Sequence, residues 1–280
     1  MSSQFSMAEL LKATNNFSSD MIIDHGDSFL LYKAQLSNGL TVAVKKHDPE
    51  EFPGFREFRA EVETLGKLRH PNIVKLLGYS ASDSGGLFVY EYIERGNLHR
   101  LLHESNTQLP WKTRLQIVKG VADALAYLHG LDNRIVHRDI KPRNVLLDSE
   151  FQPHITNFGL ARRIDSEHSH VSTTCAGDIE YMPPEYSQGL DKATLKGDVY
   201  SFGILMLEIA SGARPSFPVR LANWACIPKM KMIDSSIRRQ DLDEVVVKKY
   251  ISIACSCANK SSRERPPMTQ VVELLNQLST

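Results

Sequence analysis

The feature that most constrains the fold is a change in hydrophobic pattern near Gly96. Before it, short segments rich in β-branched and aromatic residues alternate with turn signals, and Ser37-Asn38-Gly39 favours a hairpin. After it, apolar residues recur every three or four positions over long stretches, which is typical of helices. The sequence therefore predicts an α+β protein with two lobes, a small strand-rich front and a larger helical back.

Individual elements follow from the same patterns. Ser6-Met7-Ala8-Glu9 matches a capping box that opens a short helix, and Asn15-Asn16 is expected to end it. Strands are expected over residues 29–35, 40–45, 73–79 and 87–92. Helices are expected over residues 55–68, 115–128, 199–210, 245–258 and 269–278, with Gly130 as the C-terminal cap of the second.

Composition places the chain among ordinary soluble globular proteins. Lys plus Arg and Asp plus Glu both number 33, so nothing indicates a nucleic-acid or anionic-membrane partner. The four cysteines lack the spacing of a zinc site, and reduced thiols in an intracellular protein are expected. No apolar run approaches the roughly 18 residues of a membrane span, which predicts a cytosolic domain and leaves open an anchor outside these residues.

The strongest chemical signal is the run His137-Arg138-Asp139-Ile140-Lys141-Pro142-Arg143-Asn144. It resembles the catalytic loop of protein kinases, in which the aspartate accepts the substrate hydroxyl proton and the asparagine five positions later holds a metal. Both groups are needed on one rigid loop, because phosphoryl transfer depends on positioning and charge neutralisation. Asp139, Lys141 and Asn144 are therefore the candidate catalytic residues. The alternative is a loop kept as architecture, with Arg138 left to bind a phosphate.

A second signal is Val42-Ala43-Val44-Lys45, which matches the strand that carries the phosphate-binding lysine of the same family. The expected partner of Lys45 is a glutamate on the next helix, and Glu61 follows sixteen residues later. Glu63 lies about 200° away around that helix, at about 100° per residue. The alternative for each residue is a solvated surface charge.

The resemblance covers nearly the whole chain. Gly197-Asp198-Val199-Tyr200-Ser201-Phe202-Gly203, Pro183-Pro184-Glu185 and Arg265-Pro266 follow in protein-kinase order. The form of these motifs, together with a lead-in over residues 1–18, is similar to plant leucine-rich-repeat receptor-like kinases. This implies a juxtamembrane-like lead-in at 1–18, an N-lobe and hinge at 19–93 and a C-lobe at 94–280. It also implies a location at the cytoplasmic face of the plasma membrane, and protein kinases or co-receptors as partners.

The resemblance also implies roles for single residues. Asp198 would brace the catalytic loop and Glu185 would pair with Arg265. Tyr90 falls at the gatekeeper position of the nucleotide pocket. The nucleotide-binding positions carried over from the family are Gly26, Leu31, Ala43, Lys45, Glu61, Tyr90, Glu91, Ile93 and Leu146.

The metal site departs from the family pattern. The metal-binding Asp-Phe-Gly is replaced by Asn157-Phe158-Gly159, so the metal positions are Asn144 and Asn157. Asparagine offers a neutral oxygen and removes one negative charge from the magnesium site. Losing this ligand is expected to cost at least about 10²–10⁴ in rate.

Two further departures lie beside the nucleotide and the substrate. In the glycine-rich loop, the three glycine positions hold Asp24, Gly26 and Phe29, which leaves fewer close N–H donors for phosphates. Phe29 is expected either to fold into the phosphate space or to pack beneath the hairpin. In Gly177-Asp178-Ile179-Glu180-Tyr181, Asp178 replaces a threonine and places a carboxylate near Asp139, for which Lys141 could partly compensate.

These departures predict a pseudokinase that switches by conformation and docks to a partner kinase, with weak or absent ATP binding and impaired Mg²⁺ binding. The alternative is a weakly active serine/threonine kinase, because the lysine, glutamate and catalytic-loop residues remain.

A partner kinase is expected to phosphorylate the activation segment, where Arg138 and two nearby arginines could hold phosphates. A mobile polar loop with incidental hydroxyls is the alternative. The candidate phosphorylation sites are Ser166, Ser169, Ser172, Thr173 and Thr174.

Overall fold

The computed structural model describes residues 3–26, 29–47, 55–82, 85–165, 168–172, 176–187, 192–215, 229–237 and 242–278. The chain divides into two compact units, Met1–Glu94 and Arg95–Thr280. Strands dominate the described part of the first unit and helices that of the second, so the predicted α+β fold is confirmed.

The first unit is built on a six-stranded sheet with the order β1-β5-β6-β4-β3-β2. Five strands are antiparallel, and β1 joins β5 in parallel at the edge. The predicted strand over 73–79 begins later, at Leu76. The bounds are β1 (Ser3–Gln4), β2 (Ile22–Gly26), β3 (Phe29–Gln35), β4 (Thr41–His47), β5 (Leu76–Ser82) and β6 (Gly85–Glu91).

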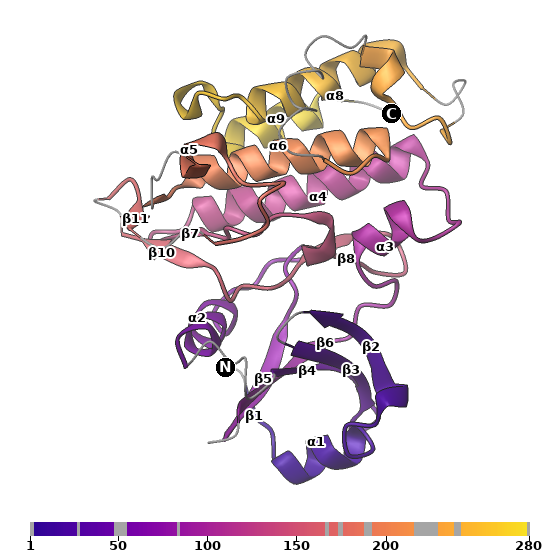
Figure 1. The fold of residues 1–280 in the computed structure, drawn as a ribbon, viewed down its shortest axis with the longest axis vertical. Coiled ribbons are helices and arrows are strands. Elements are labelled where there is room, and N and C mark those ends of the chain that lie inside the picture. The colour runs from indigo at the N-terminus through magenta and orange to yellow at the C-terminus, as the bar shows by residue number, and fades with distance from the viewer. Residues whose placement is uncertain are drawn as a thin grey trace. The chain divides into compact units, whose positions relative to one another are not determined.

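One face of this sheet is covered by the helix α1 (Met7–Ala13), as Figure 1 shows. Ser6 caps the helix by accepting a hydrogen bond from the Glu9 backbone N–H, so the predicted capping position is confirmed. Fully buried Leu10 belongs to the same hydrophobic cluster as alternate residues of β3 and β4, among them Tyr32 and Val44. Because strand side chains alternate between faces, the residues between them point to the other face.

Two further segments complete the first unit. The short 3₁₀ helix η1 spans Ser19–Met21. Helix α2 (Phe55–Leu65) ends three residues before the predicted end, and Gly66 follows it directly. Glycine loses more backbone freedom in a helix than other residues, which favours an end at that point.

In the second unit, contacts run from α9 to α4, from α4 to α6 and from α6 to α8, and these helices lie side by side in Figure 1. Helix α6 is buried nearly all round, because apolar residues occupy nearly every side of it. Gly130 caps α4 as predicted, and Gly212 ends α6 in the left-handed conformation (φ 65°). The helix bounds are α3 (Leu98–His103), α4 (Trp111–His129), α5 (Pro184–Ser187), α6 (Leu195–Ser211), α8 (Glu244–Cys257) and α9 (Met268–Asn276).

Short strands and 3₁₀ helices connect these helices. The strand pairs are β7 (Arg134–Val136) with β10 (Arg162–Ile164), β8 (Val145–Leu147) with β9 (Pro153–Ile155), and β11 (Val171–Ser172) with β12 (Lys192–Ala193). The 3₁₀ helices are η2 (Pro142–Asn144), η3 (Lys229–Met232) and η5 (Ser262–Glu264).

The predictions about membrane spans and cysteines can be compared with the described residues only. Among the described residues, no helix combines the length and the apolar character that crossing a membrane requires. Cys255 and Cys257 are free thiols, as predicted. Cys175 and Cys226 lie outside the described residues.

Candidate active site

Four of the predicted nucleotide-binding residues share one face of the sheet in the first unit. Leu31 lies opposite Lys45 in the β3–β4 ladder, and Ala43 precedes Lys45 by two positions. Opposed residues and residues two apart point to the same face of a sheet. Tyr90 lies opposite Ala43 on β6 and joins them. The face opposite α1 therefore carries the candidate site.

Lys45 and Glu61 form the predicted ion pair. Lys45 Nζ lies 3.3 Å from Glu61 Oε2, and both side chains are buried. Glu63 is half exposed and pairs with Arg59, so its predicted placement on another face is confirmed. The sequence did not predict a third partner, the Tyr90 hydroxyl, which donates to Glu61 Oε1 at 2.6 Å. Burial, with the nearby Glu61 carboxylate, raises the pKa of Tyr90 well above its usual value.

Phe29 lies over the amine of the same lysine. Lys45 Nζ is 4.8 Å from the centroid of the Phe29 ring, within the range of a cation–π contact. A Cβ added to Gly26 would come within 2.3 Å of the Phe29 ring, so the ring packs directly against that glycine. The ring thus packs between Gly26 of the β2–β3 hairpin and the Lys45 amine, which agrees with the expectation that it packs beneath the hairpin.

The remaining predicted nucleotide-binding positions differ in burial. Ala43 is buried, whereas Leu31, Glu91 and Ile93 are half-buried. Glu91 Oε1 accepts a hydrogen bond from the Lys75 backbone N–H at 2.7 Å. Leu146 belongs to the second unit, where it lies half-buried on β8.

The catalytic loop between β7 and η2 is held by Asp198, as the sequence predicted. Asp198 Oδ2 accepts a hydrogen bond from the His137 backbone N–H at 2.8 Å. Asp198 Oδ1 accepts one from the Arg138 backbone N–H, also at 2.8 Å. His129 Nε2 lies 3.0 Å from Asp198 Oδ2. Arg138 has a φ of 73°. This region of backbone costs a non-glycine residue about 1–3 kcal/mol, so the two bonds to the buried carboxylate hold a strained loop.

The Asp139 carboxylate is the centre of the site. Asn144 Nδ2 donates to Asp139 Oδ2 at 2.6 Å and to the Asp139 backbone oxygen at 2.7 Å. Asn157 Nδ2 donates to the same Oδ2 at 3.1 Å. Two amide groups therefore converge on one carboxylate oxygen. An aspartate at position 157 would instead place a second negative charge there.

The other carboxylate oxygen of Asp139 faces Lys141. Lys141 Nζ lies 3.2 Å from Asp139 Oδ1 and 3.8 Å from Asp178 Oδ2, so one ammonium lies between two carboxylates. The predicted approach of Asp178 to the loop is confirmed. Gly177 has a φ of 116°, and an added Cβ would lie 2.8 Å from the Arg138 carbonyl oxygen. That close approach requires glycine before Asp178.

Phe158 and His137 fix the segment that carries Asn157. Both are fully buried, and their rings meet edge to face with centroids 4.7 Å apart. Asn157 has a φ of 66°. Asparagine tolerates this region better than most residues, because its short polar side chain can bond locally. The position of Asn157 is therefore consistent with both its backbone and its bond to Asp139.

The activation segment is described in part. Ser169 and Ser172 are exposed, whereas Ser166, Thr173 and Thr174 lie outside the described residues. Arg138 Nη1 donates to the backbone oxygen of Leu160 at 3.2 Å. The other two candidate phosphate partners, Arg162 and Arg163, lie on β10.

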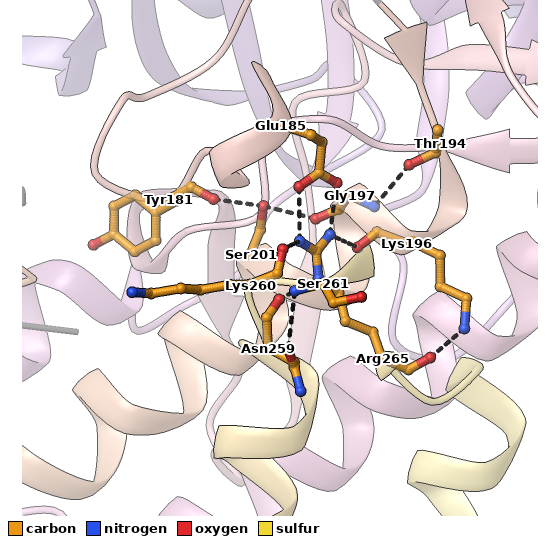
Figure 2. Close-up of polar contacts among 10 residues, drawn as sticks. All are labelled: Tyr181, Glu185, Thr194, Lys196, Gly197, Ser201, Asn259, Lys260, Ser261 and Arg265. Atoms are coloured by element: carbon orange, nitrogen blue, oxygen red, sulfur yellow. Dashed lines mark hydrogen bonds and ion pairs between the residues drawn. The ribbon is translucent and has the colours of Figure 1, made fainter. Parts of the chain in front are cut away.

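The predicted pair of Glu185 and Arg265 lies at one end of α6 (Figure 2). Arg265 Nη1 and Nη2 each lie 2.7 Å from a different oxygen of Glu185, so the pair is bidentate. Arg265 also donates to the backbone oxygens of Asn259 at 2.7 Å and Lys196 at 2.9 Å. Its guanidinium is fully buried and lies 4.9 Å from the centroid of the Tyr200 ring.

Comparisons with known proteins agree with this geometry. The profile of the family described as protein tyrosine and serine/threonine kinase matches residues 23–275. The chain is 40% identical to phytosulfokine receptor 2 of Arabidopsis thaliana, over 98% of the chain and 28% of that protein. It is 41% identical to the Arabidopsis leucine-rich repeat receptor protein kinase EMS1, over 97% of the chain and 24% of that protein. It is 38% identical to the LRR receptor-like serine/threonine-protein kinase ER1 of Oryza sativa subsp. japonica, over 96% of the chain and 28% of that protein. The chain thus spans about a quarter of the length of these relatives.

Proposed function

Because the chain belongs to the family of protein tyrosine and serine/threonine kinases, we propose that it is the intracellular pseudokinase domain of a receptor-like protein. It signals by conformational switching and by docking to a partner kinase, and its ATP- and Mg²⁺-dependent phosphoryl transfer is impaired. The observation that carries this proposal is the hydrogen bond from Asn157 Nδ2 to Asp139 Oδ2 at 3.1 Å.

The side chains beside Asp139 support the proposed impairment of magnesium binding. Magnesium takes oxygen ligands in near-ideal octahedral geometry. Asn144 and Asn157 both direct their NH₂ groups at the Asp139 carboxylate. Each can therefore offer a metal only its amide oxygen, and at position 157 this neutral oxygen replaces the charged carboxylate of the family pattern. Metal charge stabilisation is worth several kcal/mol in phosphoryl transfer, so this loss weighs heavily against turnover.

The nucleotide is also expected to bind weakly. The Phe29 ring lies on the Lys45 amine and against Gly26, where the phosphates of a bound nucleotide would need that amine and close backbone. Each lost charge-assisted hydrogen bond costs about 1.5–3 kcal/mol. Two such losses weaken affinity by about 3–6 kcal/mol, or roughly a hundredfold to ten-thousandfold.

Calorimetric titration with ATP, with and without Mg²⁺, tests this part of the proposal. The wild-type chain is expected to bind in the high-micromolar to millimolar range with little gain from the ion. Phe29→Gly is expected to tighten binding, because it exposes Lys45 without touching Asn157. A low-micromolar dissociation constant that requires Mg²⁺ in the wild type would overturn the proposal.

A weakly active serine/threonine kinase is the second candidate. It is favoured by the Lys45–Glu61 ion pair and by the placement of Lys141 and Asn144 around Asp139. Asp139→Asn in the full parent protein separates the two candidates, because it removes the proton acceptor with little change in shape. Docking without catalysis predicts unchanged signalling. Signalling lost with this single change would favour the weak kinase.

The receptor context rests on the plant receptor relatives. We propose a parent protein anchored in the plasma membrane, with this domain at the cytoplasmic face and a partner kinase or co-receptor acting on it. Exposed Ser169 and Ser172 are candidate acceptors, as are Ser166, Thr173 and Thr174. Phosphopeptide mapping of native tissue before and after stimulation is the measurement. Finding all five residues unmodified in both states would count against phosphorylation by a partner.

A further inference from the structure

A second group of charged side chains converges on His99 in the larger unit. Arg143 Nη2 lies 3.3 Å and Arg214 Nη2 lies 3.1 Å from His99 Nε2. The three residues come from three separate segments: α3, the 3₁₀ helix η2 and the segment after α6. His99 is only 6% exposed, whereas both arginines are exposed. A buried polar atom is thus faced by the guanidiniums of two exposed residues.

The imidazole of His99 is neutral at physiological pH. Burial lowers the pKa of His99 to about 4, and the Arg143 and Arg214 charges contribute to this. The other titratable groups that face it are His103 and Glu104, whose Oε1 lies 3.5 Å from His99 Nε2. Because guanidiniums only donate, Nε2 can bond to them only as an acceptor, and its single lone pair is shared between two donors.

Two positive charges and one carboxylate, that of Glu104, lie around this point. A guanidinium is always charged in proteins, so the two arginines bring two full positive charges. The half-exposed Glu104 also pairs with Arg100, with Oε2 and Nε 3.9 Å apart. Among the described residues, Arg143 has no carboxylate within ion-pair distance. A neutral nitrogen is a weak acceptor for guanidinium donors, whereas a phosphate offers charged oxygens to both.

We propose that His99, Arg143 and Arg214 form a binding site for a phosphate monoester on a phosphorylated protein partner. Arg143 directly precedes Asn144 and lies four residues after Asp139, on the loop to which this family brings a protein hydroxyl. A protein-borne phosphate can therefore reach the arginines from the same approach. The phosphate replaces His99 Nε2 as the acceptor for both guanidiniums. The site needs neither nucleotide nor catalysis, so it does not depend on the proposed loss of activity.

A metal site is the competing interpretation of the same histidine. Ligand atoms of His99, His103 and Glu208 lie within 4.8 Å of one another. However, Glu208 is already bound to His103 Nε2 at 2.8 Å and to the Tyr181 hydroxyl at 2.6 Å. The guanidiniums at His99 Nε2 also place positive charge where a divalent cation would lie. The electrostatics therefore favour an anion over a cation.

Fluorescence anisotropy with a labelled phosphoserine peptide tests the proposal, and the same peptide with unmodified serine is the reference. Arg143→Ala is expected to weaken phosphopeptide binding about tenfold or more, because a charge-assisted hydrogen bond is lost. Lys112→Ala, at an exposed position on α4, removes the same charge and is expected to change affinity less than about twofold. Arg143→Gln serves in place of the alanine variant if that variant unfolds.

Four results would overturn the proposal. One is no difference between the phosphorylated and unmodified peptides. Another is an equal loss of affinity in Arg143→Ala and Lys112→Ala, which would indicate unspecific attraction. Inorganic phosphate that competes as well as the phosphopeptide would show a site for the free anion. Zinc binding that is abolished by His99→Ala would assign the cluster to a metal.

Discussion

Removing the Arg265 side chain is expected to destabilise the larger unit more than removing an exposed charged side chain does. Its guanidinium is 0% exposed and is held by two 2.7 Å bonds to Glu185. The backbone oxygens of Asn259 and Lys196 accept two further hydrogen bonds from it, at 2.7 Å and 2.9 Å. Arg265 thus ties the segment after α8 to both α5 and α6 (Figure 2).

The expected cost follows from what the substitution leaves behind. Arg265→Ala leaves the Glu185 carboxylate, 18% exposed, and two carbonyl oxygens without their donors. Removing one partner of a buried ion pair costs about 3–5 kcal/mol. Arg265→Lys keeps the charge but cannot form the planar fork, so a loss of about 1–3 kcal/mol is expected.

Urea unfolding followed by circular dichroism measures these changes in free energy. The matched control is Lys248→Ala on α8, because Lys248 and Glu244 form a pair in which both side chains are more than half exposed. Such a pair contributes less than about 1 kcal/mol. An Arg265→Ala variant that loses less than about 1 kcal/mol, or no more than the control, would show that the buried pair does not stabilise this unit.

Three other changes probe the packing. Because the pKa of His99 is lowered to about 4, this residue binds fewer protons in the folded chain than in the unfolded chain between about pH 4 and 6.5. Stability should therefore fall from pH 7 to 5, and His99→Gln should reduce that fall by about 1–2 kcal/mol in urea titrations, after screening by water. Tyr90→Phe removes the 2.6 Å bond to Glu61 and should lower the unfolding free energy by about 1.5–3 kcal/mol, measured by thermal unfolding. Gly212→Ala should cost at least about 1–3 kcal/mol in the same assay, because φ is 65° and the new Cβ would lie 2.5 Å from Asp234 Oδ2.

Contacts set by short spacings and helix faces could be predicted from the sequence. Lys45 and Glu61 meet because one lies on a strand and the other on the inward face of the next helix. Asp198 reaches the catalytic loop from the first turn of α6, a position that the family motif marks. Local chemistry also located the Ser6 cap of α1.

Contacts that depend on tertiary placement could not be predicted from the sequence. The Tyr90 hydroxyl reaches Glu61 across 29 positions, and neither pattern nor spacing indicates that pair. The sequence showed that Asn157 had lost a charge, but it did not reveal that the new amide donates to Asp139. Three separate segments converge on His99, which only a folded chain brings together.

Autophosphorylation with radioactive ATP and Mg²⁺ measures whether this domain transfers phosphate, with Asp139→Asn as the reference. We expect the wild-type chain and this variant to incorporate the same background label. Asn157→Asp alone is not expected to restore full activity, because Phe29 still covers Lys45 and Asp178 still faces Lys141. A wild-type turnover of about 1–100 s⁻¹, as is typical of kinases, that is abolished by Asp139→Asn would show that the domain is an active kinase.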